Sequence, residues 1–240
     1  MKYFLFTGFI ISCLFYSCKK SDGGVANFML VNGTYSVNSL TAAINGTAIN
    51  ASPLTQGQYS GTIAAPYNKI PPGTNNLTVS FGTTIFLDKN IYTGSVNGYS
   101  LLIYDTSASI VSPNYLFLTD DLTKPDTSLV KFRFIYTMPG DSIDFLLTKK
   151  TDSTKADSVA NIQTFIGNNP TAASLQSFGF TPKHGTYKPF IFNHSTAQLL
   201  YTSDSITMGK AQIISFIYSG LPNGTGNSAP KFTMIVHPPN

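Results

Sequence analysis

The sequence has few charged residues, no tryptophan and no cysteine beyond its first eighteen positions. Charged residues make up 11% of the 240 residues, against about 25% in an average soluble protein. Because both cysteines, Cys13 and Cys18, lie in the N-terminal segment, the body of the chain forms no disulfide within itself. Its stability must therefore come from side-chain packing.

The scarcity of charge also limits the class of partner. The formal net charge is +4, and no basic run beyond Lys19 and Lys20 forms a patch. Nucleic-acid binding depends on dense Lys and Arg that displace counterions from phosphates, so we expect no nucleic-acid partner. The surface must instead rely on Ser, Thr, Asn and Gly, as is common in extracellular β-proteins.

The N-terminal segment has the organisation of an export signal. Lys2 supplies a positive charge, and an apolar stretch from Tyr3 to Tyr16 follows it. This stretch is too short for a membrane-spanning helix, which needs about 20 apolar residues. The segment Leu14-Phe15-Tyr16-Ser17-Cys18 resembles a lipobox, in which a peptidase cuts before a cysteine that carries diacylglycerol.

Two cysteines compete as the lipidated residue. The lipobox usually has Leu, Val or Ile three places before the cysteine, and Ile10-Ile11-Ser12-Cys13 fits this pattern better than the segment with Phe15 does. Lipidation at Cys13 would, however, leave Leu14-Phe15-Tyr16 exposed and shorten the hydrophobic region. We therefore predict a signal peptide over residues 1–17, lipidation at Cys18 and a flexible tether over residues 18–25.

The residues after the predicted cleavage site suggest a location. Cys18-Lys19-Lys20-Ser21-Asp22 resembles the start of mature lipoproteins of Bacteroidetes, where a lysine with acidic residues signals export to the cell surface. Several acyl chains, at about 0.8 kcal/mol per buried methylene, would make the attachment stable. We expect an outer-membrane lipoprotein, on the cell-surface or the periplasmic face, with the membrane as one partner.

The rest of the chain contains one strand pattern twice. Residues 26–31 align with residues 130–135, and both segments alternate as half-buried strands do. In the second copy Phe132 and Phe134 share one face, so we expect Lys131 and Arg133 to point to water. The later strands of each copy are expected at residues 40–45 and 142–148, 98–105 and 211–219, and 114–119 and 231–237.

Turn signals separate the expected strands. Asn45-Gly46 predicts a type I′ hairpin, which needs positive φ at both positions, and Pro72-Gly73 and His184-Gly185 mark an equivalent turn in each half. Many short strands indicate an all-β fold, and about 100 residues is the size of one immunoglobulin-like sandwich. We predict two tandem immunoglobulin-like β-sandwich domains, residues 26–123 and 129–240, joined by a linker over residues 124–128.

One segment is open to two interpretations. Val159, Ile162 and Ile166 have helical spacing before Gly167 and Pro170, which favours a short helix between Asp152 and Ile166. The segment is short enough that a strand remains the alternative.

Four motifs carry a resemblance to a known family. They follow one another after the first strand as Ile44-Asn45-Gly46-Thr47, Ser52-Pro53-Leu54, Gln58-Tyr59-Ser60-Gly61 and Ile70-Pro71-Pro72-Gly73-Thr74. In this order they resemble the family called domain of unknown function 4397. The second copy is looser, with Lys149-Lys150 where Asn-Gly-Thr is expected. The resemblance covers most of residues 26–240. It implies paired immunoglobulin-like sandwiches on envelope lipoproteins and brings no established activity with it.

The sequence contains no recognisable catalytic motif. There is no Gly-x-Ser-x-Gly elbow, Walker loop or dinucleotide fingerprint. His184, His194 and His237 lack the spacing of a zinc protease, so surface or turn positions fit them better than a metal site. Adjacent Asp120 and Asp121 would point to opposite faces of a strand and make a poor acid-base pair. A loop Ca²⁺ site that uses them is an alternative, without EF-hand spacing. We expect no enzyme activity and no cofactor.

Turn-adjacent tyrosines are the candidate ligand contacts. Tyr59, Tyr67, Tyr92 and Tyr187 each have an apolar face and a hydroxyl with which to stack on sugar rings. The lack of tryptophan weakens this interpretation, and core or rim packing fits each of them better.

Two tripeptides are candidates for modification. Asp157-Ser158-Val159 and Asp204-Ser205-Ile206 resemble the Asp-Ser/Thr-apolar acceptor of O-glycosylation in Bacteroidetes. Glycosylation at Ser158 or Ser205 is therefore a hypothesis that the recurrence of the tripeptide motivates.

Together these features favour a non-catalytic binding or adhesion module at the cell envelope, in which loops contact a glycan or a protein partner. Loops on a rigid sandwich scaffold vary freely, and recognition usually depends on them. Two alternatives stay open. One is a structural stalk or envelope-assembly role that uses open edge strands, and the other is a hydrolase with an unrecognised site.

Overall fold

The computed structural model describes residues 24–95, 97–105, 113–138, 142–151, 155–165, 178–179 and 181–239. The predicted export signal, Cys13 and Cys18 lie outside these residues. Strands β1 to β16 make up nearly all of the regular structure, with one short 3-10 helix, η1 (Gly226–Ser228). The prediction of an all-β sandwich fold is confirmed.

The N-terminal half forms two sheets of four strands each. The N-terminal inner sheet has the order β4 (Asn68–Ile70), β1 (Ala26–Gly33), β7 (Gly98–Tyr104) and β8 (Asn114–Asp120). The N-terminal outer sheet has the order β3 (Thr47–Ala48), β2 (Leu40–Ile44), β5 (Gly73–Phe81) and β6 (Thr84–Thr93). An apolar core lies between the two sheets and includes Phe28, Leu40, Leu77, Val79 and Leu101.

The C-terminal half also forms two sheets. The C-terminal inner sheet has the order β16 (Lys231–His237), β15 (Ile213–Ser219) and β9 (Lys131–Tyr136). The C-terminal outer sheet has the order β11 (Lys155–Phe165), β10 (Ile143–Thr151), β12 (Gly185–Asn193) and β13 (Leu199–Thr202), with β14 (Ile206–Met208) also paired to β12. Aromatic rings dominate the core between these sheets, where Phe132, Phe134, Phe145 and Phe216 are fully buried.

The two halves share one strand topology. Strand β1 runs parallel to β7, which pairs antiparallel with β8, and β9, β15 and β16 repeat this arrangement. Among the described strands, none of one half joins a sheet of the other. The pairing is consistent with the domains expected over residues 26–123 and 129–240 and a linker over 124–128, whose boundaries remain a prediction.

Two glycine turns follow the sequence expectation. Asn45 and Gly46 have φ values of 51° and 77°, and the hairpin that they form joins β2 to β3. The prediction of positive φ at both positions is therefore confirmed. Gly73 and Gly185, with φ values of 108° and 155°, begin the equivalent strands β5 and β12.

The alternatives for residues 152–166 are now decided where the backbone is described. Residues 155–165 form strand β11, which pairs antiparallel with β10. The helix interpretation was wrong there, because the free edge of β10 supplies hydrogen-bond partners that the sequence periodicity alone does not reveal.

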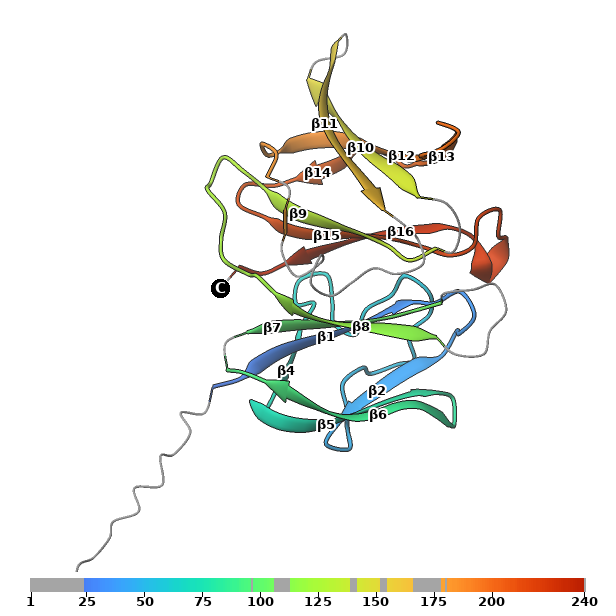
Figure 1. Cartoon of the computed structure of the whole chain (residues 1–240). Coiled ribbons are helices and arrows are strands. Elements are labelled where there is room, and N and C mark those ends of the chain that lie inside the picture. The colour runs from blue at the N-terminus through green and yellow to red at the C-terminus, as the bar shows by residue number, and fades with distance from the viewer. Residues whose placement is uncertain are drawn as a thin grey trace, which may run out of the picture.

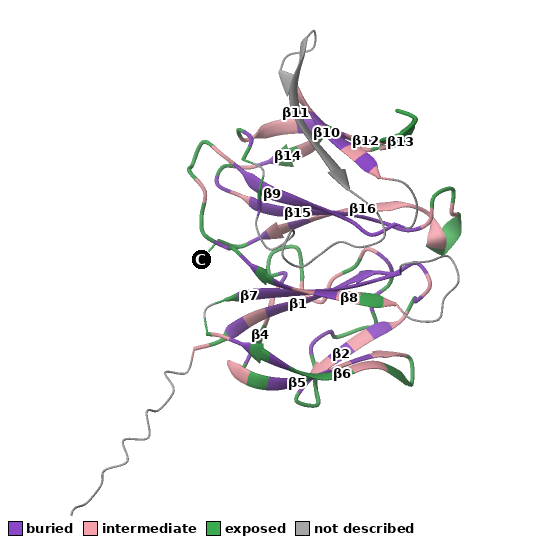
Figure 2. Cartoon of the chain, in the orientation of Figure 1, coloured by how far each residue is buried: buried purple, intermediate pink, exposed green. Residues whose placement is uncertain are grey.

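The four sheets are stacked as four layers, with the two inner sheets face to face in the middle (Figure 1). Met29 and Val31 of β1 and Leu118 of β8 pack against Ile135 and Ile217 of the C-terminal inner sheet. Strands β1, β7, β9 and β15 are consequently buried almost throughout (Figure 2). The surface between the halves is thus a third apolar core.

This packing overturns one expectation about β9. Lys131 and Arg133 were expected to point to water, but they are only 6% and 2% exposed. The alternating pattern correctly identified one buried face of the strand. It did not reveal that the opposite face is covered by the N-terminal inner sheet.

We predict that the two halves unfold together. Ile217→Ala should destabilise the protein by about 2–5 kcal/mol, because it removes buried methyl groups from the third core. Calorimetry should show one transition at a lowered midpoint, since loss of the shared core exposes both inner sheets. Ile85→Ala, at an exposed position of β6, is the matched control. Two well-separated transitions in the wild type would contradict this account.

Candidate functional site

A group of polar side chains lies at one end of the third core. Asp120 and His237 are the last residues of β8 and β16, and Ser100 and Ser215 lie on the neighbouring strands β7 and β15. The interface polar cluster, as we call it, consists of Tyr67, Ser100, Asp120, Arg133, Ser215 and His237. Five of these residues are buried, and Tyr67 reaches in from the loop before β4.

Arg133 connects the two halves at this point. Its Nη2 lies 2.7 Å from Asp120 Oδ1, and its Nε donates a hydrogen bond to Ser215 Oγ at 2.8 Å. The hydroxyls of Tyr67 and Ser100 each donate to Asp120 Oδ2 at 2.6 Å. The carboxylate therefore receives charge and hydrogen bonds from both inner sheets, as a buried ion must if it is not to destabilise the fold.

The same contacts determine the protonation of His237. Tyr67 has one hydroxyl proton, which goes to Asp120, so His237 Nδ1 must donate to the Tyr67 oxygen at 2.6 Å. Since Ser215 Oγ already accepts from Arg133, it is able to donate to His237 Nε2 at 2.7 Å. A neutral imidazole protonated at Nδ1 satisfies every one of these contacts at once.

The pKa values in the cluster follow from burial and charge. Burial and the charge of Arg133 lower the pKa of His237 to about 3, against the opposing effect of Asp120. Burial acts to raise the pKa of Asp120, but Arg133 and the hydroxyl donors outweigh it, so this pKa is lowered. Burial and Asp120 raise the pKa of Tyr67. At neutral pH the cluster therefore contains one ion pair and a neutral histidine.

An aromatic ring covers the cluster. Phe178 lies 4.5 Å from the guanidinium of Arg133 and 5.6 Å from Lys131 Nζ, measured to the ring centre, and its ring is steeply inclined to that of His237, with ring centres 5.3 Å apart. Lys131 also forms an ion pair with Asp121 at 2.9 Å. These contacts separate Arg133 from water and strengthen its attraction to Asp120.

Ser215 and His237 have the spacing of a nucleophile and its base, but their surroundings do not suit catalysis. Ser215 is 1% exposed and accepts a hydrogen bond from Arg133, which draws electron density away from its oxygen. The ion pair and hydrogen bonds of the cluster link the two inner sheets.

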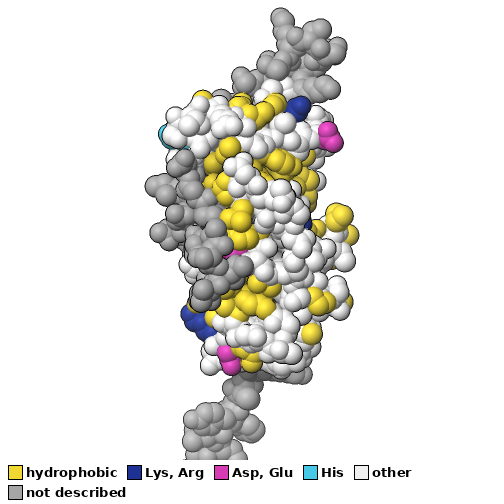
Figure 3. All heavy atoms as spheres, turned by 90° about the vertical axis from the view of Figure 1, so that its right-hand side faces the viewer, with side chains coloured by type: hydrophobic (Ala, Val, Ile, Leu, Met, Phe, Trp, Pro, Cys, Tyr) yellow, Lys and Arg dark blue, Asp and Glu magenta, His cyan; other side chains and the backbone are white. Residues whose placement is uncertain are grey.

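The described surface has three hollows of note. The first, of about 390 Å³, lies beside the polar cluster where the halves meet. Its wall includes Ile63, which is 87% exposed, and its rim carries Lys124 and Lys210. The face in Figure 3 shows few charged side chains, which fits the low charge of the sequence.

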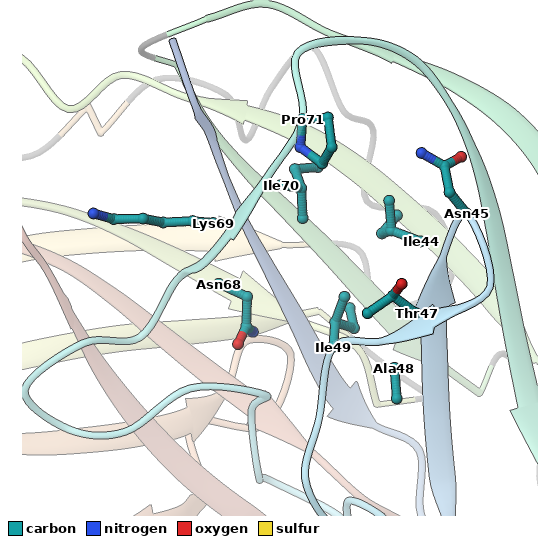
Figure 4. A pocket seen from close by; sticks show the side chains of 9 residues that line it. All are labelled: Ile44, Asn45, Thr47, Ala48, Ile49, Asn68, Lys69, Ile70 and Pro71. Atoms are coloured by element: carbon teal, nitrogen blue, oxygen red, sulfur yellow. The ribbon is translucent and has the colours of Figure 1, made fainter. Parts of the chain in front are cut away.

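The second hollow, of about 300 Å³, lies between the edge strands β3 and β4 of the N-terminal sandwich. Figure 4 shows the β2–β3 hairpin with Ile44 and Ile49 on one side and Ile70 on the other. The side chain of Lys69 points away from the hollow. The floor is apolar and the rim carries the amides of Asn45 and Asn68.

The third hollow, of about 180 Å³, lies between the edge strands β6 and β8 on the other side of the same sandwich. It reaches the core residues Leu77 and Leu101 and is walled by Leu87 and Phe117. No acidic residue lines it.

The four candidate tyrosines differ in exposure. Tyr92 is 72% exposed and accessible for stacking, whereas Tyr59 packs against the third core and Tyr67 belongs to the polar cluster. For Tyr187 the stacking hypothesis was wrong, and the core packing favoured for it is confirmed. Its ring is fully buried and its hydroxyl donates to the backbone oxygen of Lys183, because the chain turns it inward at the start of β12.

The candidate histidines and the two adjacent aspartates also differ in exposure. His194 is in an exposed turn, paired with Asp144, whereas the expectation of a surface position was wrong for buried His237. Asp120, the last residue of β8, is buried, whereas Asp121 follows the strand and is exposed. Among the described residues, no group of three or more His, Cys, Asp or Glu side chains is arranged to hold a metal ion.

The glycosylation hypotheses concern two different settings. Ser205 is exposed between β13 and β14 and open to modification. Ser158 belongs to β11, opposite Thr148, and its side chain lies outside what the structure describes.

The polar cluster was missed from the sequence, although a signal exists. With β1 aligned on β9, the strand registers make Ser100 equivalent to Ser215 and Asp120 equivalent to His237. Polar residues at equivalent positions of otherwise apolar strands were thus visible in both copies. What the sequence lacked was the knowledge that these two positions face each other.

Comparison with known proteins adds no family. No protein-family model matches the chain, and no curated protein shows a significant match. The resemblance to domain of unknown function 4397 therefore stays a prediction. Within the residues that the structure describes, no helix has the length and apolar character needed to cross a membrane.

We predict that His237 makes stability depend on pH. Because its pKa is about 3 in the folded protein and 6.5 in the unfolded reference, the unfolded chain binds the proton first as pH falls. Its contribution to stability is complete above pH 6.5 and is lost between pH 6.5 and 3. The urea midpoint of the wild type should fall between pH 7 and 4.5. In His237→Asn this dependence should be weaker. Equal slopes in the wild type and in His237→Asn would contradict the assignment.

We predict a strong dependence on the buried ion pair. Arg133→Met should cost about 3–5 kcal/mol, since it leaves the Asp120 carboxylate buried without its counter-charge. Adding Asp120→Asn should recover part of this loss, which a double-mutant cycle in urea would measure. Asp121→Asn is the control at a half-exposed pair and should cost at most about 1 kcal/mol. Additive losses for the two buried residues would show that they are not coupled.

Proposed function

We propose that the protein is a non-catalytic binding or adhesion module of the bacterial envelope, anchored to the outer membrane through lipidated Cys18. One observation carries the proposal. The side chains able to act in catalysis that lie together, Asp120, His237 and Ser215, are buried within the interface polar cluster. Of these three, only His237 lines one of the three hollows, and both of its ring nitrogens are bonded, to Tyr67 and to Ser215, so the linings suit contact and not reaction.

The placement of the anchor supports a presenting role. Strand β1 begins at Ala26, shortly after Cys18, so the tether leads directly into the N-terminal sandwich. The C-terminal sandwich is stacked beyond it (Figure 1). Because the third core joins the two sandwiches, they would be held at the membrane as one body.

The surface favours a protein over a glycan as the partner. Of the tyrosines named as sugar contacts, only Tyr92 presents most of its ring to solvent, and the chain has no tryptophan. Free strand edges and the apolar hollows beside them are features that proteins recognise, through backbone hydrogen bonds and inserted side chains.

A structural role as a stalk or an assembly factor is the second candidate. The observation in its favour is the third core itself, since a rigid pair of sandwiches is a suitable spacer. A deletion strain separates the two functions. Weakened envelope integrity with no loss of a bound partner would favour the stalk.

The anchor and the binding role are tested together. In cell fractionation, Cys18→Ala should move the protein from the membrane to the soluble fraction because the acyl chains are lost. Cys13→Ala should leave it membrane-bound. Protease treatment of intact and lysed cells then gives the face of the membrane. The immobilised full chain should retain a defined envelope protein or polysaccharide, and failure to retain either would contradict the proposal.

A further inference from the structure

The β6–β8 seam is the opening between the edge strands of the N-terminal outer and inner sheets. Among the described strands, β6 pairs only with β5 and β8 only with β7, so each has one free edge. Between them lies the third hollow, whose floor is formed by the core residues Leu77 and Leu101. An apolar opening thus lies beside unpaired backbone groups.

A charged side chain crosses this seam. Lys89 of β6 lies opposite Leu77 of β5, so it occupies the row of β6 that faces the core. Its Nζ donates to the hydroxyl of Tyr115 at 3.1 Å and lies 5.7 Å from the centre of that ring. Both residues line the hollow. A long flexible side chain therefore lies across the seam, beside the half-buried Leu87 and Phe117.

The second copy of the repeat closes the same place differently. The strand registers make Phe232 of β16 equivalent to Tyr115 of β8. Tyr201 of β13 packs on Phe232, with ring centres 5.7 Å apart, and on Tyr218 at 5.5 Å. An aromatic ring thus seals the C-terminal sandwich where Lys89 covers the N-terminal one.

The size of the hollow limits its occupant. Sites for small molecules usually measure about 300–1,000 Å³, and this one measures about 180 Å³. That volume suits one large apolar side chain. Because free strand edges flank the hollow, the side chain is best delivered by an extended peptide, whose backbone pairs with the edge while alternate side chains enter the pocket.

We propose that the β6–β8 seam binds an extended segment of a protein partner. The segment adds to the free edge of β6, inserts one large apolar side chain between Leu87 and Phe117, and places an acidic side chain beside Lys89. Charge complementarity supports the acidic residue, since Lys89 and no acid lines the hollow. This inference rests on the proposed binding function and specifies its partner.

A second copy of this chain fits the seam less well. If two β6 strands paired antiparallel with their cores on the same side, residues of the same face would lie opposite each other. The two registers with the fullest overlap then place Asp88 opposite Asp88, or Lys89 opposite Lys89. Like charges directly opposite destabilise a strand pair.

The test uses fluorescein-labelled nonapeptides of alternating Ser and Thr with a central Phe and a Glu two places after it. Fluorescence anisotropy with the full chain should show binding about tenfold tighter than for analogues with central Ala or with Lys in place of Glu, because each analogue loses one of the two contacts. Lys89→Glu should reverse the preference between the Glu and Lys peptides.

A matched pair of variants locates the site. Leu87→Trp fills the hollow and should abolish peptide binding, whereas Ile85→Trp, exposed on the same strand and outside the lining, should retain it. Thermal melting by circular dichroism checks that both variants fold. Binding that ignores the central side chain, or that survives Leu87→Trp, would overturn the proposal. Absence of any peptide binding would do the same, as would a concentration-dependent dimer that Leu87→Trp abolishes.

The same variants separate this inference from the proposed function. If the wild type and Leu87→Trp retain the same envelope component equally, the seam proposal fails while the binding function stands. If neither retains any component but the peptide preference holds, the seam proposal stands and the envelope binding role fails.

Discussion

The contact between the two inner sheets is the feature on which the rest of the molecule depends. A sheet that is covered on both faces must bury both rows of its side chains, and strands β1, β7, β9 and β15 are buried almost throughout. Burial of Arg133 within that contact has an electrostatic cost, which Asp120 with its hydroxyl donors, the Ser215 hydroxyl and the Phe178 ring offset. Apolar packing supplies the attraction, and the ion pair makes it specific to one arrangement.

The contact is also nearly symmetric with respect to the repeat. In the third core, Val31 is equivalent to Ile135, Leu102 to Ile217 and Leu118 to Ile235. The same face of each copy thus packs on the other, as in an isologous dimer within one chain. Symmetry breaks at Asp120, whose equivalent is His237. Two identical acids would repel each other there, and a neutral imidazole avoids this.

Comparison of the two copies also shows which features repeat and which do not. Packing of the inner sheets and of each core repeats, and so does the glycine turn before β5 and β12. The outer seam does not, since Tyr201 seals one copy and Lys89 covers the other. The packed features are shared, whereas the opening covered by Lys89 is present in one copy.

Local chemistry was sufficient for part of this structure. The φ preference of Asn45-Gly46 determined a hairpin, and the apolar pattern identified four strands in each repeat, which the structure has as β1, β2, β7 and β8 and as β9, β10, β15 and β16, because these signals act between residues near in sequence. The positions of Arg133, Tyr187 and His237 depend on which sheet covers which face, and residues distant in sequence decide that. Strand β11 is a similar case. The spacing of its apolar residues favoured a helix, but this segment pairs with the edge of β10 in the folded protein. The sequence by itself therefore determined four strands of each copy and their repetition. Only the tertiary structure decided that the two copies pack face to face, because burial of a second strand face is a property of the partner sheet.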